Sequence, residues 1–459
     1  GQPSGLGVVG SNVERGLNVN ATQYSNDPAA FDQVGKVGLG NIEISDDGKF
    51  LFVVNLYQRK VFRLELNNAA NPTSVISVTE YALPVQTCTN GVQRPFGIKY
   101  YRKKLYVGSV CTGENGGVNT VGGATNLYAY VYELNNPKGA ASFTATPLIS
   151  FPLNYAKGGA MTWTTPDYGL QWYPWVKNTS TTVGSNTDRT LPQPILADIE
   201  FSDRGDLIMS FLDRGGNQWG ENNYINLSGT SMMKYAIGGD LIIAGLNCAG
   251  TYTLENSGNV TSLYSQALTG SANNQGVGTG EFFSGDTWSN VHQETTLGGL
   301  AVLKGSAEVF ACIMDPTGIN TGGSKRMSTT NGTEIASSGC RLYTAGAAFG
   351  GKSAGLGDVE LITPDAPIEI GNRVWNDANG DGVQNAGEAI FNGLTVQLYS
   401  NGVDNIAGTA DDVLLGTTTT SATGEWYFNA TNITDGDPNS AGNQAGPQPN
   451  YNYNVRVAT

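Results

Sequence analysis

Short stretches in which apolar and polar residues alternate recur through residues 1–363. The alternation has a period of two, which is typical of β-strands that bury one face. Many of these stretches come in pairs joined by a Gly-containing turn. The clearest copies, residues 40–54 and 197–210, align without a gap, and weaker copies lie at 96–108 and 299–312. The pattern therefore predicts a series of antiparallel hairpins.

A third alternating stretch often follows the hairpin, as at residues 60–66 and 127–134. Repeated units of three or four antiparallel strands are typical of β-propellers. We therefore predict an all-β fold in which residues 1–363 form a β-propeller of about seven blades, with six or eight as alternatives. Residues 156–194 and 256–296 interrupt the repeat and are expected to be long inserted loops. A large β-sandwich is the competing interpretation of this region.

The character of the chain changes near a Pro-rich linker at residues 363–367. Beyond it, residues 364–459 contain no Lys, and eleven acidic residues stand against two basic ones. We predict that residues 364–459 form a second, strongly acidic domain. Because residues 451–457 still alternate like a strand, this domain is expected to continue past Thr459 in a longer protein.

The composition excludes several classes of partner. The 459 residues carry a formal net charge of −14, and only 14% of them are charged. Nucleic acid and anionic lipid both require a basic face, so neither is expected as a partner. The sequence has no run of 18 apolar residues, which predicts that this segment does not insert into a membrane.

The five cysteines lack the CxxC spacing of structural zinc sites. Cys88 and Cys111 flank one strand unit, and Cys312 and Cys340 flank another. We expect both pairs to be disulfides, which indicates an oxidising, extracellular compartment. Cys248 is left over. The alternative is that the cysteines are buried thiols that pack as small apolar side chains.

Residues 377–388 match the calcium-loop pattern D-x-[DN]-x-[DN]-G-x5-E at every position. Ca²⁺ prefers six to eight oxygen ligands, and this spacing wraps such oxygens around one centre. The flanking residues alternate like strands, so a helical EF-hand is not expected. A solvated acidic turn is the alternative. The predicted calcium ligands are Asp377, Asn379, Asp381, the Val383 carbonyl and Glu388.

A second acidic loop follows at residues 404–412. It contains Asp404, Asp411 and Asp412, and three carboxylates so close in sequence suggest a further cation site. The alternative is a solvated loop.

Residues 371–388 together with 393–398 and 416–428 resemble the B-type repeat of staphylococcal serine-aspartate repeat (SdrD-type) surface proteins. The resemblance covers residues 368–459. It implies an immunoglobulin-like β-sandwich, stiffened by Ca²⁺, that acts as a stalk or spacer, and it assigns the calcium-ligand roles to the same loop residues. Related modules can contain a Lys–Asn isopeptide bond, which the absence of Lys excludes within this one.

Features of an enzyme are sparse. The single histidine, His292, is expected to be structural, and neither a Gly-x-Ser-x-Gly nor an HExxH motif is present. Residues 168–175 are rich in aromatic side chains that could stack on a sugar, although a packed loop is the preferred interpretation. We predict that the chain is not an enzyme. Three acidic residues that could approach a propeller channel are Asp198, Asp213 and Asp358.

The sequence as a whole predicts a secreted bacterial cell-surface protein with a structural or adhesive role, for example in a filament or stalk. Its expected partners are other surface proteins or copies of itself, and glycans are a further candidate. The alternative is a calcium-dependent carbohydrate-active propeller enzyme or a lectin-like propeller. Clustered carboxylates in the channel would favour this alternative, whereas small or apolar groups there would favour a structural role.

Overall fold

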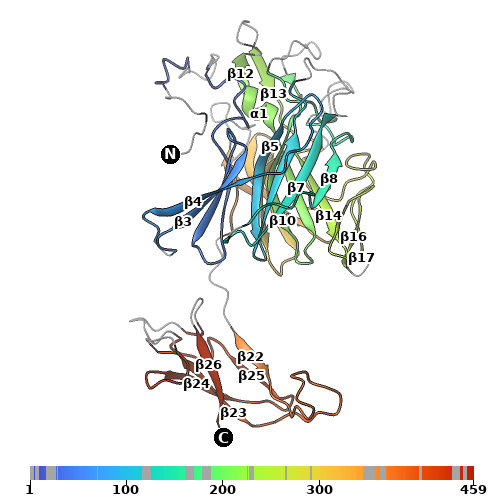
Figure 1. Cartoon of the computed structure of the whole chain (residues 1–459). Coiled ribbons are helices and arrows are strands. Elements are labelled where there is room, and N and C mark those ends of the chain that lie inside the picture. Colours follow the sequence, from blue (N-terminus) through green and yellow to red (C-terminus); the bar gives the residue numbers. More distant parts are fainter. Residues whose placement is uncertain are drawn as a thin grey trace. The chain divides into compact units, whose positions relative to one another are not determined.

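The chain folds into two compact units, residues 1–361 and 362–459, which are described separately below. Both units consist of β-strands, and the described residues contain one short helix (Figure 1). This confirms the predicted all-β class. The computed structural model describes residues 5, 10–16, 27, 29–69, 71–115, 126–139, 141–160, 170–177, 188–224, 226, 232–263, 266–289, 292–344, 357–361, 369–402, 406–436, 445–447 and 452–458.

Unit 1 contains four antiparallel four-stranded sheets, which we call sheets I to IV. In each sheet the strands follow one another in chain order. Sheets I and II are β1 (Leu39–Ile44), β2 (Phe50–Asn55), β3 (Lys60–Leu66) and β4 (Val75–Ala82), then β5 (Gln93–Tyr101), β6 (Lys104–Cys111), β7 (Tyr128–Asn135) and β8 (Ile149–Pro152). Sheets III and IV are β10 (Pro194–Phe201), β11 (Leu207–Asp213), β14 (Asp240–Leu246) and β15 (Tyr252–Leu254), then β18 (Thr296–Leu303), β19 (Glu308–Met314), β20 (Thr321–Ser328) and β21 (Cys340–Thr344).

Smaller elements lie between these sheets. A three-stranded sheet and one helix interrupt sheet III, and a strand pair follows it. They are β9 (Asp188–Arg189), α1 (Arg214–Trp219), β12 (Glu221–Tyr224) and β13 (Met232–Tyr235), and the pair β16 (Asn259–Ser262) and β17 (Gln266–Thr269).

The four hairpins predicted from the alternating pattern are the first two strands of the four sheets. Residues 40–54 form β1 and β2, and residues 197–210 form most of β10 and β11. The weaker copies form β5 with β6 and β18 with β19. The prediction is confirmed: the alternation of apolar and polar residues located the strands, and glycines such as Gly48 and Gly205 located the turns. Both glycines have φ values, +67° and +88°, that other residues rarely adopt.

The hydrophobic core of unit 1 lies between successive sheets. One cluster joins sheets I and II, a second joins II and III, and a third joins III and IV with β16 and β17. All eight residues of β10 are buried, because that strand is covered on both faces. The first strands of the sheets also contact one another, β1 against β5, β5 against β10, and β10 against β18.

The predicted number of blades is not met by the described strands. They form four four-stranded sheets, whereas seven blades were expected. One reason is that residues 256–296 are more than a loop. They contain β16 and β17, and Val260, Leu268, Phe282 and Phe283 from this segment enter the core beside sheets III and IV. Closure into a ring is not established by these sheets alone.

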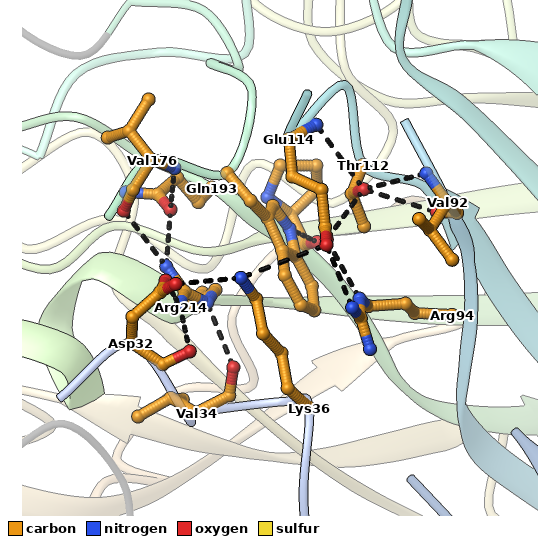
Figure 2. A network of polar contacts seen from close by, with 12 residues as sticks. Asp32, Val34, Lys36, Val92, Arg94, Thr112, Glu114, Val176, Gln193 and Arg214 are labelled. Carbon is orange, nitrogen blue, oxygen red and sulfur yellow. Dashed lines mark hydrogen bonds and ion pairs between the residues drawn. The ribbon is translucent and has the colours of Figure 1, made fainter. Parts of the chain in front are cut away.

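A polar network anchors residues 32–36 to sheets II and III (Figure 2). At its centre is Arg214, whose side chain is fully buried. Its guanidinium donates to Asp32 Oδ1 at 2.7 Å, to Gln193 Oε1 at 2.8 Å and to the Val34 carbonyl at 2.9 Å. Lys36 extends the network by pairing with Asp32 at 3.0 Å.

The far side of this network belongs to sheet II. Arg94 binds both oxygens of Glu114 at 2.8 Å, and Thr112 donates to Glu114 at 3.0 Å. The Trp175 ring lies near both guanidiniums, 4.9 Å from Arg214 and 5.7 Å from Arg94. The network therefore ties this segment to strands that lie far from it in sequence.

The cysteine prediction is confirmed for one pair and wrong for the other. Cys88 and Cys111 form a disulfide with a Cα–Cα distance of 5.3 Å. Cys312 and Cys340 are free thiols. Both pair with Ser324 of β20, one from each side, so they are two strand spacings apart. That separation is about 9–10 Å, and a disulfide cannot form beyond about 7 Å.

Thiol labelling of the native protein should separate these cysteines. Cys248 and Cys340 are exposed and should react with iodoacetamide at pH 8. Cys312 is buried, and burial raises its pKa to about 12, so it should react only after unfolding. Cys88 and Cys111 should react only after reduction. Peptide mass spectrometry measures each site, and labelling of Cys312 in the native state or of Cys88 before reduction would contradict the structure.

Unit 2 contains two small antiparallel sheets. Val396, Leu398, Trp426 and Phe428 of these sheets form one core with Ile433, which follows β25. The first sheet pairs β22 (Ile370–Arg373) with β25 (Glu425–Phe428). The second places β23 (Thr395–Ser400) between β24 (Val413–Thr419) and β26 (Tyr453–Val457).

No helix among the described residues is long or apolar enough to span a bilayer.

Candidate functional site

The first strands of all four sheets carry a register irregularity at the same place. Extra residues interrupt the pairing at 40–41 in β1, 96–97 in β5, 197 in β10 and 297–299 in β18. Such bulges bend a strand and redirect its side chains. Nearly all of these residues line one pocket of about 480 Å³, which the bulges of the four sheets therefore build together.

Small residues at the bulges let the first strands approach closely. A Cβ atom on Gly97 would lie 3.0 Å from the backbone of Ala197. Gly298 has φ +104°, and a Cβ there would lie 3.0 Å from the Ala197 Cβ. A side chain at either position would push the sheets apart. This close approach explains why a small residue stands near the start of each repeated unit.

Carboxylates gather in this pocket, as the alternative prediction required. Asp198, Asp358 and Glu360 all line it, whereas Asp213 does not. Asp213 instead caps α1, accepting from Gly215 N at 2.8 Å, and burial raises its pKa to about 6. The other lining residues are small or apolar, apart from two asparagines: Gly40, Asn41, Ile42, Phe96, Ala197, Leu212, Asn217, Leu297, Gly298, Gly299 and Gly357.

Asp198 joins three sheets through its carboxyl group. Its oxygens accept from Leu300 N at 2.7 Å, from Ile199 N at 2.7 Å and from Asn41 Nδ2 at 3.2 Å. Burial and the neighbouring Asp358 charge raise the pKa of Asp198 well above its usual value. Both effects favour the protonated form of the Asp198 carboxyl group over the charged form.

A cluster of charged side chains lies on the first strands β1, β5 and β10. Lys99 binds Glu200 at 2.7 Å and lies 3.6 Å from Glu43. Burial raises the pKa of Glu43 to about 8, and Lys99 only partly offsets this effect. Burial likewise raises the pKa of Glu200. The carboxylates raise the pKa of Lys99 against the effect of burial, so the lysine stays charged.

Sequence analysis missed this cluster, although a signal for it was present. Glu43 and Glu200 occupy the same position of the two gap-free copies, and Lys99 occupies that position in the copy at 96–108. Because equivalent residues of neighbouring first strands contact one another, aligned charges of opposite sign predict an ion pair between sheets.

Asp198 links the first strands β1, β10 and β18 through its bonds with Asn41 Nδ2 and Leu300 N.

Other features considered for catalysis are packed inside unit 1. His292 is buried, and its ring contacts the Ala160 carbonyl and lies 3.4 Å from Asp315. In the aromatic segment, Trp172, Tyr173 and Trp175 are all buried, so they cannot stack on a sugar from solvent. Residues 168 and 169 lie outside the described residues.

The predicted calcium loop, residues 377–388, is exposed and turns around its own carboxylates. Asp377 accepts from the N–H groups of Gly380 at 2.7 Å and Gly382 at 2.9 Å. Asp381 accepts from Val383 N at 2.8 Å. Hydrogen bonds lower the pKa of both carboxyl groups. The Gly382 N–H is the most important donor for Asp377, and the Asn385 side chain is the most important for Asp381.

Glu388 closes the loop by reaching back to its start. One oxygen accepts from Ala378 N at 2.9 Å, and the other accepts from Asn385 N at 2.8 Å. Asn385 in turn donates to the Val383 carbonyl at 3.1 Å, so the five predicted ligands belong to one hydrogen-bonded loop. All of the groups are oxygens, which suits Ca²⁺. Among the described residues, however, the carboxylate oxygens of Asp377, Asp381 and Glu388 do not all lie within 4.8 Å of one another.

In the second acidic loop, the described carboxylates have partners within the chain. Asp412 forms an ion pair with Arg456 of β26 and accepts from Gly408 N at 2.8 Å. Asp411 accepts from Thr409 Oγ1 at 2.6 Å. A cation here would compete with an arginine for Asp412. Asp404 lies outside the described residues.

Residues 368–439 match the SdrD B-like domain family. The matched segment contains the loop 377–388 and four of the five described strands of unit 2 completely. It confirms the resemblance expected from the sequence for the C-terminal part of the chain.

Longer relatives come from Dictyostelium discoideum. The chain is 27% identical to Colossin-B over 415 residues, which covers 86% of this chain but 10% of Colossin-B. It is also 27% identical to Colossin-C over 386 residues, 80% of this chain and 34% of that protein. The chain therefore corresponds to a minor part of each relative. The alignment to Colossin-B is too long to lie in unit 1 alone, so it extends into both units.

Among solved structures, a β-fructofuranosidase from Microbacterium saccharophilum K-1 aligns with 71% of this chain and 60% of its own, at 12% identity and a TM-score of 0.28. A similarity of this size carries no conclusion about fold or activity.

Proposed function

We propose that this chain is part of an extracellular structural protein, in which a propeller-like unit is followed by a spacer module that Ca²⁺ stiffens. The observation that carries the proposal is the SdrD B-like match at residues 368–439, which encloses an oxygen-rich loop already folded around Asp377 and closed by Glu388. In this proposal the two small sheets of unit 2, with their shared core, form an immunoglobulin-like sandwich.

The Cys88–Cys111 disulfide supports an extracellular location, because such bonds persist in oxidising compartments. We further propose that the protein is adhesive and binds other surface proteins, glycans or further copies of itself. The relatives come from Dictyostelium discoideum, so they do not support the bacterial origin expected from the sequence.

Unit 1 is proposed to be a propeller. Three features support this arrangement: sheets whose strands follow chain order, first strands that contact one another in succession, and a pocket built by equivalent bulges. The loops of a propeller can bind partners. A polar centre in such a fold does not by itself indicate catalysis.

A sugar-binding or carbohydrate-active propeller is the second candidate. The observation that favours it is the set of carboxylates in the pocket, with Asp358 and Glu360 exposed at its wall. A glycan array and a panel of glycoside substrates would test it, with Asp358→Asn as the variant. Binding or turnover that this variant abolishes would replace the structural proposal for unit 1.

The main experiment measures the effect of Ca²⁺ on unit 2 in the full chain. Removal of the cation leaves Asp377, Asp381 and Glu388 mutually repelling, so calorimetry in chelator should show a lower melting temperature for unit 2. Ligand at a hundredfold excess over Kd stabilises the folded state by about 2.7 kcal/mol. Mg²⁺ should restore stability poorly, because it demands a tighter octahedral shell.

Glu388→Gln should remove most of the calcium effect on unit 2, since it deletes a two-oxygen charged ligand. The matched control is Glu369→Gln, which changes an exposed glutamate of the same unit that accepts from Asn429 at 2.9 Å and lies outside the loop. Identical melting curves of unit 2 with Ca²⁺ and with chelator would show that the loop is an acidic turn. They would contradict the proposal that Ca²⁺ stiffens the spacer module.

A further inference from the structure

Three carboxylates converge inside unit 1, far in sequence from the predicted calcium loop. Glu281, Asp286 and Glu294 each place an oxygen within 4.8 Å of the others. Their side chains belong to residues that are 5%, 1% and 0% exposed. They come from the irregular segments that connect β17 to β18. Burial of three like charges is very costly unless a cation or protons neutralise them.

Oxygens that lack a hydrogen-bond partner point into this cluster. Both carboxylate oxygens of Glu294, one oxygen of Asp286 and Oε1 of Gln275 are buried without a donor. Buried polar groups in folded proteins are nearly always satisfied, so four such atoms in one place require an explanation. Converging acceptors without donors are typical of cation sites, where the ion takes the place of the donors.

The backbone makes room for these oxygens at Gly158. A Cβ atom on that residue would lie 2.3 Å from Gln275 Oε1 and 2.5 Å from Glu294 Oε1. Gln275 and Glu294 therefore bring their oxygens to the same spot from different segments. Gly158 also has φ +97°, a conformation that suits glycine, so a larger residue is excluded on two grounds.

One lysine, Lys157, lies near the cluster, and its charge acts on Asp286 and Glu294. The ammonium of Lys157 donates to the carbonyls of Gly158 at 3.3 Å and Gly239 at 3.2 Å. Its charge also acts on the buried Asp240, which binds Tyr155 at 2.6 Å. A single positive charge shared in this way leaves the three carboxylates with excess negative charge.

We propose that Glu281, Asp286, Glu294 and Gln275 Oε1 form a buried binding site for a divalent cation, with Ca²⁺ as the ion. All four ligands are oxygens, which favours a hard cation. Ca²⁺ tolerates irregular shells of protein oxygens, whereas Mg²⁺ demands near-octahedral geometry and usually keeps several waters. The proposal does not rest on the calcium loop of unit 2.

The ion would join the two long segments that interrupt the strand repeat. Residues 156–160 and 275–294 already touch through backbone bonds, from Gly276 N to Ala156 O at 2.7 Å and from Gln293 N to Gly159 O at 3.0 Å. The side chain of Gln293 adds a third bond by accepting from Gly159 N at 2.8 Å. A cation beside these contacts would hold together segments that few regular strands support.

Shared protons are the alternative to a metal. Burial raises the pKa of Asp286 to about 7 and that of Glu294 well above its usual value, so the acids could stay neutral without any ion. The two explanations predict opposite behaviour for Glu294→Gln. If protons neutralise the site, this neutral replacement should not change calcium binding. If Ca²⁺ occupies it, the replacement should remove one bound ion.

The experiment counts calcium on the full chain after chelation, reloading with CaCl₂ and desalting, by elemental mass spectrometry. Glu294→Gln should lose one Ca²⁺ per chain relative to the wild type, and Glu388→Gln should lose a different one. The double variant should lose both. The matched control is Glu334→Gln, which changes a partly exposed glutamate of unit 1 that pairs with Lys325. A folded Glu294→Gln protein with wild-type calcium content would overturn the proposal.

Hydrogen exchange of the wild type tests the same site without any substitution. The relevant amides are those of residues 275–289 and 292–294 that exchange through opening of this site. With calcium at a hundredfold excess over Kd, they should exchange about a hundredfold more slowly than in chelator. Protection confined to residues 377–388 would place the calcium in unit 2 alone and refute the buried site. Calcium-dependent protection of 275–289 with no effect at 377–388 would support this site and contradict the spacer proposal.

Discussion

Arg214→Met should lower the stability of unit 1 by about 3–5 kcal/mol, because it removes one partner of a buried, hydrogen-bonded charge pair. Arg214 is fully buried and binds Asp32 at 2.7 Å and Gln193 at 2.8 Å. Methionine fills a similar volume but removes the donor to Asp32 Oδ1, to Gln193 Oε1 and to three backbone carbonyls. Arg214→Lys should also be destabilising, since a lysine cannot reproduce the planar fork that reaches these acceptors together (Figure 2).

The matched control is Arg326→Met. Arg326 also pairs with a carboxylate, Glu308 at 2.7 Å, and also lies near an aromatic ring, but its side chain is 36% exposed. Exposed pairs contribute at most about 1 kcal/mol. Calorimetry and urea unfolding of the two variants give the comparison. Equal, small losses in both would show that the network at residues 32–36 is dispensable.

The stability of unit 1 should fall as the pH rises from about 5 to about 8, and Glu43 should account for part of the fall. Burial raises the pKa of Glu43 to about 8 from 4.5 in the unfolded chain. Between these values the folded state holds a proton that the unfolded state has lost. The stabilisation is complete below the unfolded pKa and is lost as the pH passes the folded one. One such group contributes about 1.4 kcal/mol per pH unit, or about 4 kcal/mol across the window.

Glu43→Gln should flatten this pH dependence, because the amide does not titrate. Glu80→Gln is the control, since Glu80 belongs to the same sheet but its side chain is 41% exposed, in an ion pair with Lys60. Calorimetry from pH 5 to pH 8 at constant calcium would measure the difference between each variant and the wild type. A Glu43→Gln protein whose melting temperature keeps the wild-type slope would show that Glu43 ionises normally.

The sequence predicted the features that depend on neighbouring residues. Period-two alternation with a glycine turn specified the hairpins, because both the buried face and the turn conformation are encoded locally. The calcium-loop pattern located Asp377 to Glu388 for the same reason, since all five predicted ligands lie within one loop. The charged position of each repeated unit even contained Glu43, Lys99 and Glu200, although an alignment of sheets was needed to see that they meet.

The tertiary structure alone decided which distant segments meet. Both cysteine pairs flank a strand unit in sequence. Cys88 and Cys111 form a disulfide. Cys312 and Cys340 remain free thiols, because strand β20 lies between them. Arg214 pairs with Asp32, and Glu294 lies beside Glu281 and Gln275. These contacts join segments whose sequences show no strand pattern that could have been aligned to predict them. Local alternation fixes which face of a strand is buried, but the partner of a buried charge depends on how whole sheets pack, and no short stretch of sequence contains that information.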